Sequence, residues 1–137
     1  MRIPTLLFAV LLAPAFASEP DDSHAQDGGL PESPAINIPY ESPAAALAAV
    51  RAKPGVVTEE HEEWFVLNDS AESSVWSITK PGHFAHPTVV LRRTYERDGQ
   101  VFIGMDVKCG SSKRNCDRVV QQFIALNNQI RERLVAE

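Results

Sequence analysis

The sequence of residues 88–109 reads TVVLRRTYERDGQVFIGMDVKC, and it decides the predicted fold because it holds two strand-like runs joined by a turn. β-branched and aromatic residues are frequent in both runs, residues 88–96 and 101–109. Their apolar residues all carry odd numbers: Val89, Leu91, Tyr95, Val101, Ile103, Met105 and Val107. A three-residue loop, Arg97-Asp98-Gly99, with Gly99 in the left-handed conformation, would place odd positions opposite odd positions. We therefore expect a hairpin with this loop and a single apolar face.

Two shorter runs precede this hairpin, residues 63–67 and 74–79, and bulky apolar residues alternate with other residues in both. The residues expected to face the core are Trp64, Val66, Trp76 and Ile78. Residues 68–70 read NDS and supply turn chemistry between the two runs. Together with the hairpin, these runs predict a four-stranded antiparallel β-meander.

A short helix is predicted before the strands. Ser42 is a good N-cap, Pro43 suits the first helical position, and the alanine-rich run through Lys53 favours a helix. Pro54 and Gly55 are expected to end it.

A longer helix is predicted at the end of the chain, from Cys116 to about Val135, with Asn115 as its N-cap. Its apolar stripe consists of Val119, Val120, Phe123, Leu126, Ile130 and Leu134. The expected fold is a two-layer α+β domain, in which this C-terminal helix packs on one face of the sheet.

The first 17 residues have the layout of a secretory signal peptide: a cationic start at Arg2, an apolar run at 5–12 and the cleavage motif AFA at 15–17. The apolar run is too short to span a bilayer, which requires roughly 20 residues. Residues 18–41 are expected to form a disordered, proline-rich acidic linker, so that the folded domain spans residues 42–137. Alternating Ile36, Ile38 and Tyr40 leave open a short edge strand or a docked extended segment.

Cys109 and Cys116 are the two cysteines of the chain. Because thiols are usually oxidised outside the cytoplasm, we expect them to form one disulfide, between the end of the last strand and the last helix. Their spacing differs from the C-x-x-C of redox motifs, and no histidine is near enough in sequence to suggest a zinc site.

The connection at residues 80–87, KPGHFAHP, is the first candidate functional site, because binding residues concentrate on loops held by a rigid scaffold. The candidate binding residues are Lys80, His83, Phe84 and His86. His83 and His86 could also hold zinc or copper, with His61 or a glutamate of residues 59–63 as a further ligand. The alternative is a structural loop, in which Phe84 packs into the core and the histidines are solvated.

The loop closed by the two cysteines is the second candidate, because basic residues surround the N-terminus of the last helix there. These residues are Lys108, Lys113, Arg114 and Arg118. Helix N-termini offer free N–H groups and partial positive charge, so a phosphate, a carboxylate or an anionic envelope polymer could bind. The alternative is that these side chains are simply solvated.

The net charge of −5 gives no electrostatic reason to expect nucleic-acid binding. The chain also lacks the glycine-rich phosphate loop and the nucleophile elbow of common enzymes. We therefore expect a small exported binding or accessory protein, periplasmic or secreted, without a cofactor or a membrane span after signal cleavage. Its partner would be an envelope protein or an anionic envelope polymer. The alternative function is a metal-binding protein or metal-dependent enzyme that uses His83 and His86.

Overall fold

The computed structural model describes residues 36–136. The predicted signal peptide, residues 1–17, and residues 18–35 of the predicted linker lie outside the described residues. The elements, in chain order, are α1 (Pro43–Arg51), β1 (Val57–Glu60), β2 (Trp64–Asp69), the 3₁₀ turn η1 (Ser70–Glu72), β3 (Ser74–Thr79), β4 (Thr88–Arg97), β5 (Gln100–Cys109) and α2 (Lys113–Val135). The predicted α+β class is confirmed.

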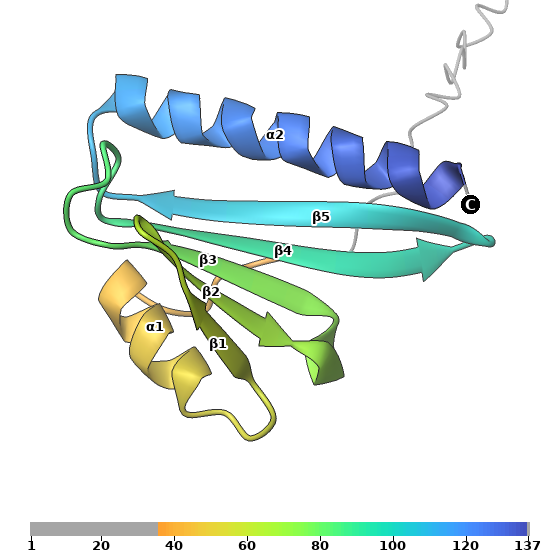
Figure 1. The fold of residues 1–137 in the computed structure, drawn as a ribbon, viewed down its shortest axis with the longest axis horizontal. Helices are drawn as coiled ribbons and strands as arrows, with labels where there is room; N and C mark the ends of the chain where they lie inside the picture. Colours follow the sequence, from red (N-terminus) through yellow and green to blue (C-terminus); the bar gives the residue numbers. More distant parts are fainter. Residues whose placement is uncertain (1–35, 137) are drawn as a thin grey trace, which may run out of the picture. The chain divides into compact units, whose positions relative to one another are not determined.

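The strands form one antiparallel meander in the order β1-β2-β3-β4-β5 (Figure 1). The sheet has five strands, and the prediction of four missed β1. This strand reads VTEE and pairs with β2 from Val57 opposite Asn68 to Glu60 opposite Phe65. Three of its four residues are polar or charged and its valine is exposed, which suits a sheet edge but gives no apolar pattern to recognise.

The β4–β5 hairpin has a two-residue loop, Asp98-Gly99, so the predicted three-residue loop is wrong. Val90 lies opposite Val107, and every odd position of β4 lies opposite an even position of β5. Asp98 and Gly99 have φ of 52° and 75°, as in the type I′ turn that Asp-Gly favours. The odd-numbered apolar residues of β4 and β5 therefore point to opposite faces of the sheet.

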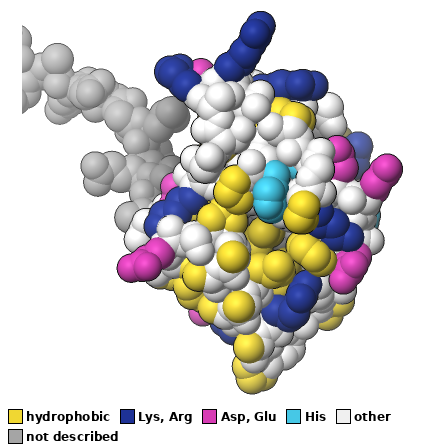
Figure 2. Space-filling view, turned by 90° about the vertical axis from the view of Figure 1, so that its left-hand side faces the viewer, with side chains coloured by type: hydrophobic (Ala, Val, Ile, Leu, Met, Phe, Trp, Pro, Cys, Tyr) yellow, Lys and Arg dark blue, Asp and Glu magenta, His cyan; other side chains and the backbone are white. Residues whose placement is uncertain are grey.

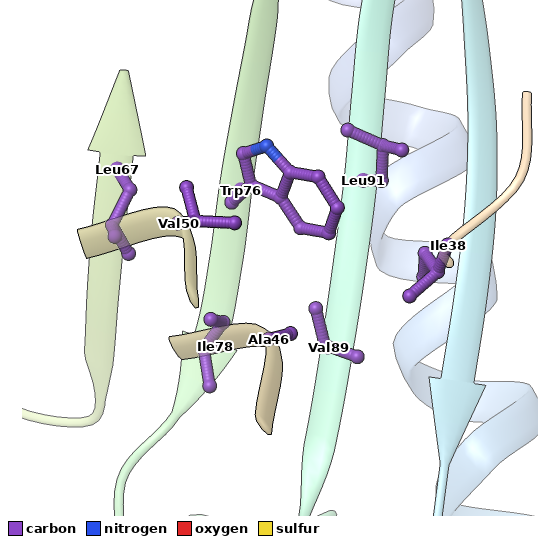
Figure 3. Packing of buried hydrophobic residues seen from close by; sticks show 8 residues of the cluster. All are labelled: Ile38, Ala46, Val50, Leu67, Trp76, Ile78, Val89 and Leu91. Atoms are coloured by element: carbon purple, nitrogen blue, oxygen red, sulfur yellow. The ribbon is translucent and has the colours of Figure 1, made fainter. Parts of the chain in front are cut away.

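Both faces of the sheet are covered, α1 on one and α2 on the other, so the domain has three layers where two were expected (Figure 1). Figure 3 shows the core under α1, which consists of Ile38, Ala46, Val50, Leu67, Trp76, Ile78, Val89 and Leu91. The core under α2 consists of Ala85, Val90, Val119 and Phe123. Trp76 faces α1 as a core residue, whereas Trp64 packs against the core under α2.

Residues 36–40 are docked on the α1 face of the sheet. The sequence left open such a docked extended segment as the alternative to a disordered linker. Ile38 is only 1% exposed, and its N–H donates to Asp106 Oδ2 at 2.8 Å. Lys108 Nζ donates to the carbonyl oxygen of Tyr40 at 2.6 Å. Residues 36–40 therefore belong to the folded domain, which begins before the predicted residue 42.

The helix ends show one correct and one incorrect capping prediction. Ser42 caps α1 as predicted, and its Oγ accepts from the Ala45 N–H at 3.1 Å. The cap of α2 is Ser112, so this helix begins at Lys113 and not at Cys116. The side chain of Asn115, the predicted cap, donates instead to a carbonyl oxygen of the loop at 80–87. No helix in the described range 36–136 is long and apolar enough to cross a membrane.

The predicted disulfide is confirmed. Cys109 and Cys116 are bonded, with their Cα atoms 5.7 Å apart. The bond joins the last residue of β5 to the first turn of α2. It therefore fixes the start of α2 at the end of the sheet where the loop at 80–87 also lies.

Candidate functional site

The two candidate loops lie side by side at one end of the sheet. The backbone N–H of Gly110 donates to the carbonyl oxygen of Pro87 at 2.8 Å, and Asn115 Nδ2 donates to that of Phe84 at 2.8 Å. We call residues 80–87 together with 109–118 the loop cluster. The meander itself could have predicted this meeting, because β3 and β5 run in the same direction and end at the same edge of the sheet.

The loop at 80–87 is held by its own hydrogen bonds. The His83 N–H donates to the Lys80 carbonyl oxygen at 3.2 Å, and the His86 N–H donates to that of His83 at 3.0 Å. The hydroxyl of Thr88 donates to the Ala85 carbonyl oxygen at 2.5 Å, and the His86–Pro87 peptide bond is cis. The hydrogen bonds within the loop make it an ordered platform.

His83 is buried, 6% exposed, with its ring between Trp64 and Phe84 at centroid distances of 4.6 and 4.4 Å. Its Nδ1 accepts from the Ala85 N–H at 3.0 Å. Burial lowers the pKa of His83 below its usual value, so the imidazole is neutral at pH 7. With Nδ1 accepting, the proton of the neutral ring sits on Nε2, and this tautomer leaves no free lone pair for a metal. The expectation of two solvated histidines is wrong for His83. Phe84 packs against the core under α2, as expected, and remains partly exposed.

His86 is exposed, and its Nδ1 lies 3.1 Å from Thr79 Oγ1. His61 lies in the β1–β2 turn, with its Nε2 3.5 Å from Glu59 Oε2. Within residues 36–136, no group of three or more His, Cys, Asp or Glu side chains is placed to hold a metal. The further ligand expected from His61 or from the glutamates of residues 59–63 is thus not assembled with the loop histidines.

The basic candidates separate into different environments. Arg118 lies over the ring of Phe84, with its Cζ 4.1 Å from the centroid. Lys113 pairs with Asp117 at 2.5 Å on the surface of α2, and Arg114 is exposed. Lys80 pairs with Glu60 at 3.3 Å. Lys108 does not join the others, because it faces the α1 side of the sheet and holds the docked segment at 36–40.

The loop cluster presents a mixed apolar and basic surface. Figure 2 shows this end of the molecule, where hydrophobic side chains gather around a histidine and lysine and arginine side chains stand at the margin. Pro81, His86 and Pro87 are exposed, and Phe84 is partly exposed. An aromatic ring beside a guanidinium is typical of residues that dominate binding at protein interfaces.

A row of rings connects the loop cluster to a groove on the α2 side. The row runs from Phe84 through His83 and Trp64 to Phe123, and the last two centroids are 5.5 Å apart. The groove has a volume of about 240 Å³ and is lined by His61, Trp64, Val66, Ser77, Arg92, Phe123 and Leu126. It lies beside α2, which packs mainly against β5.

Arg92 is the charged residue of this groove. Its Nε is buried without a hydrogen-bond partner, and its Cζ lies 5.5 Å from the centroid of Phe123. Burial lowers the pKa of Arg92, but a guanidinium stays charged at neutral pH. No residue of this groove other than His61 was predicted as a site residue from the sequence. The available signal was the pair Arg92-Arg93, because neighbouring strand residues point to opposite faces and a sheet covered on both sides must bring one arginine near each core.

Comparison of the chain with protein-family models, with curated proteins and with solved structures finds no match. The loop cluster and the groove are therefore the features from which a function is inferred.

Proposed function

We propose that this chain is a small exported binding protein, periplasmic or secreted and without catalytic activity of its own, and that it holds its partner with the loop cluster. The observation that carries this proposal is the stacking of Arg118 on Phe84. Asn115 fixes the backbone of Phe84, and the disulfide fixes the first turn of α2. A surface ordered before binding loses less conformational entropy when a partner binds.

Export is supported by the layout of residues 1–17. The disulfide is compatible with an oxidising compartment. The test is to express the full chain in a bacterial host and determine the N-terminus of the product by mass spectrometry after cell fractionation. We expect a product that begins at Ser18 outside the cytoplasm. A product that keeps residues 1–17 and stays in the cytoplasm would contradict export.

The partner that best fits the loop cluster is an envelope protein. Phe84 and Arg118 supply an aromatic ring and a guanidinium, and Phe and Arg are both enriched at protein interfaces. The alternative partner, an anionic envelope polymer, would bind through Lys113, Arg114 and Arg118. The two differ in salt dependence, because binding to a charged polymer weakens steeply as added salt screens the charges.

The experiment measures capture of envelope components by the immobilised protein and by two variants, Phe84→Ala and Arg118→Ala. We expect each variant to weaken capture of the same component about thirtyfold or more, as for a hot-spot residue. The matched control is Gln100→Ala, an exposed change in the hairpin at the start of β5. Equal capture by the variants, the control and the original chain would disprove the assignment of the loop cluster.

A further inference from the structure

We propose that the groove beside α2 is a binding site for a small carboxylate ligand with an apolar body, and that Arg92 anchors the carboxylate. This site is separate from the partner surface proposed above and does not depend on it.

Two consecutive arginines differ in what neutralises them. Arg93, on the α1 face, donates from Nη2 to Glu72 Oε2 at 3.3 Å. Arg92, on the α2 face, forms no ion pair with any acidic residue of the described part of the chain. Its Cζ lies 5.5 Å from the centroid of Phe123, and its guanidinium donates no hydrogen bond to any other described residue. A partly buried cation without an anion is costly, and a bound anion would remove that cost.

Most of the groove lining is apolar, so the ligand needs an apolar body. The apolar lining residues are Trp64, Val66, Phe123 and Leu126. Val66 lies opposite Ser77, and Ser77 lies opposite Val90, so these residues form a row across the sheet. Trp64 lies two residues before Val66 on β2, and Arg92 lies two residues after Val90 on β4. The two side chains therefore flank the row on opposite sides. The volume of about 240 Å³ is below the roughly 300–1,000 Å³ of drug-sized pockets, so it suits one ring or a short alkyl chain.

The number of donors favours a carboxylate over a phosphate group. A guanidinium presents paired, parallel N–H groups, and a carboxylate accepts two of them at once. The other polar side chains of the lining are Ser77 and His61. A phosphate group has more oxygens and more charge to satisfy, and Arg92 is the only lysine or arginine in this lining.

Trp64 provides the readout for a binding experiment. The chain has two tryptophans, and Trp76 is buried under α1 away from the groove. In a Trp76→Phe background, the fluorescence of Trp64 should respond to a ligand in the groove. The probe is 3-phenylpropionate, and the matched control is its uncharged amide, 3-phenylpropanamide. We expect saturable binding of the acid and about tenfold weaker binding of the amide, as for the loss of one charge-assisted hydrogen bond.

Variants distinguish Arg92 from its neighbour. Arg92→Gln should weaken binding of the acid about tenfold or more, and Arg93→Gln should leave it unchanged. Equal binding of acid and amide, or equal effects of the two substitutions, would overturn the proposal. No saturable response to the acid at millimolar concentration would also overturn it.

A measurement on the unchanged chain covers the case in which Arg92→Gln does not fold. The ¹⁵N–¹H signal of the Arg92 side-chain Nε should shift when the acid is added, and it should not shift with the amide.

A further experiment identifies the source of the carboxylate. Short peptides that end in phenylalanine are compared with a free and with an amidated C-terminus. Binding of the free form shows that the site accepts a peptide terminus, and binding of 3-phenylpropionate alone restricts it to small acids. Absence of both contradicts the proposal.

Discussion

Single residues in this fold take their environment from the face of the sheet on which the register places them. Arg92 and Arg93 are adjacent in sequence, yet Arg93 meets a glutamate and Arg92 meets a phenylalanine. Lys108 was predicted to join an anion site with Lys113 and Arg118, and it instead holds the Tyr40 carbonyl oxygen on the opposite side. The types of these residues were readable from the sequence. Their partners were not, because a partner depends on the pairing of distant strands.

The pair formed by Asp69 and Lys53 should make stability depend on pH. Asp69 is 3% exposed, and the hydrogen bond from Lys53 at 2.5 Å, aided by charge attraction, holds the pKa of Asp69 below its usual 3.8. Because this pKa is lower in the folded state than in the unfolded state, the stabilisation is complete above about pH 5 and is lost as the pH falls through the folded-state value. The free energy of unfolding should therefore fall more for the original chain than for Asp69→Asn between about pH 6 and about pH 3.

The size of this effect is limited by water. The side chain of Lys53 is 39% exposed, so we expect Asp69→Asn to cost about 1 kcal/mol at neutral pH, less than a fully buried charged hydrogen bond because water screens the pair. Urea denaturation at both pH values measures it. Glu72→Gln, on the exposed partner of Arg93, is the control for a surface carboxylate. Parallel pH curves for the original chain and Asp69→Asn would contradict the prediction.

Gly104 should be needed because Ile36 lies directly against it. A Cβ added at Gly104 would lie 1.8 Å from Ile36 Cδ1, far inside contact distance. Gly104→Ala should therefore destabilise the chain by up to about 1 kcal/mol, the low end for overpacking, because the obstructing atom is the end of the Ile36 side chain. The same change in an Ile36→Ala background should cost close to nothing, because the obstructing atom is gone. Thermal or urea unfolding of the four chains measures the coupling, and additive effects would show that Ile36 does not pack there.

The helices and strands were predicted correctly where one local sequence signal determined their ends. They were predicted less well where two candidate caps or two possible hairpin registers were available. Ser42 and Pro43 determined the start of α1. The α2 cap was misplaced because Ser112 and Asn115 are both good caps, and the contact of Asn115 with Phe84 decides between them. The predicted hairpin register is wrong because apolar residues at odd positions of both strands do not require a single apolar face when both faces of the sheet are covered. Because a helix covers each face, Val89 of β4 packs in the core under α1 and Val107 of β5 packs against the core under α2. This arrangement is compatible with the two-residue Asp98-Gly99 turn.

The disulfide should stabilise the junction of β5 and α2. It closes a short loop, so the double variant Cys109→Ala/Cys116→Ala should lose roughly 2–3 kcal/mol of unfolding free energy through the greater freedom of the unfolded chain. Reduction of the original chain should produce a similar loss in urea denaturation. The aromatic contacts of Phe84 with His83 should survive in the folded variant, because they do not involve the sulfurs. A loss below about 0.5 kcal/mol would contradict this role, since it is far under the range for such loops.

At the scale of the whole molecule, residues 36–40 complete the core on the α1 face of the sheet, although the composition of residues 18–41 predicts a linker. Residues 18–41 are rich in proline and acids, and that average hides the alternation of Ile36, Ile38 and Tyr40 near its end. Ile38 fills the core under α1 (Figure 3). Tyr40 packs against the same core, with its ring 5.7 Å from that of Trp76. Composition is averaged over a window, whereas burial is decided residue by residue once a sheet face is present to receive the side chains.

Two shortened chains test this role of residues 36–40, one beginning at Ile36 and one at Glu41. The longer chain keeps Ile38 in the core. It also keeps the hydrogen bond from the Ile38 N–H to Asp106 and the hydrogen bond from Lys108 to the Tyr40 carbonyl oxygen. We expect the chain beginning at Glu41 to be less stable by about 3–5 kcal/mol or to fail to fold, because it loses a fully buried isoleucine together with its backbone contacts. Within the full-length chain, Ile38→Ala should cost about 2–4 kcal/mol, and Asn37→Ala, at an exposed position, should change little. Equal urea midpoints for the two shortened chains would show that the docked segment does not support the fold, whatever contacts it makes.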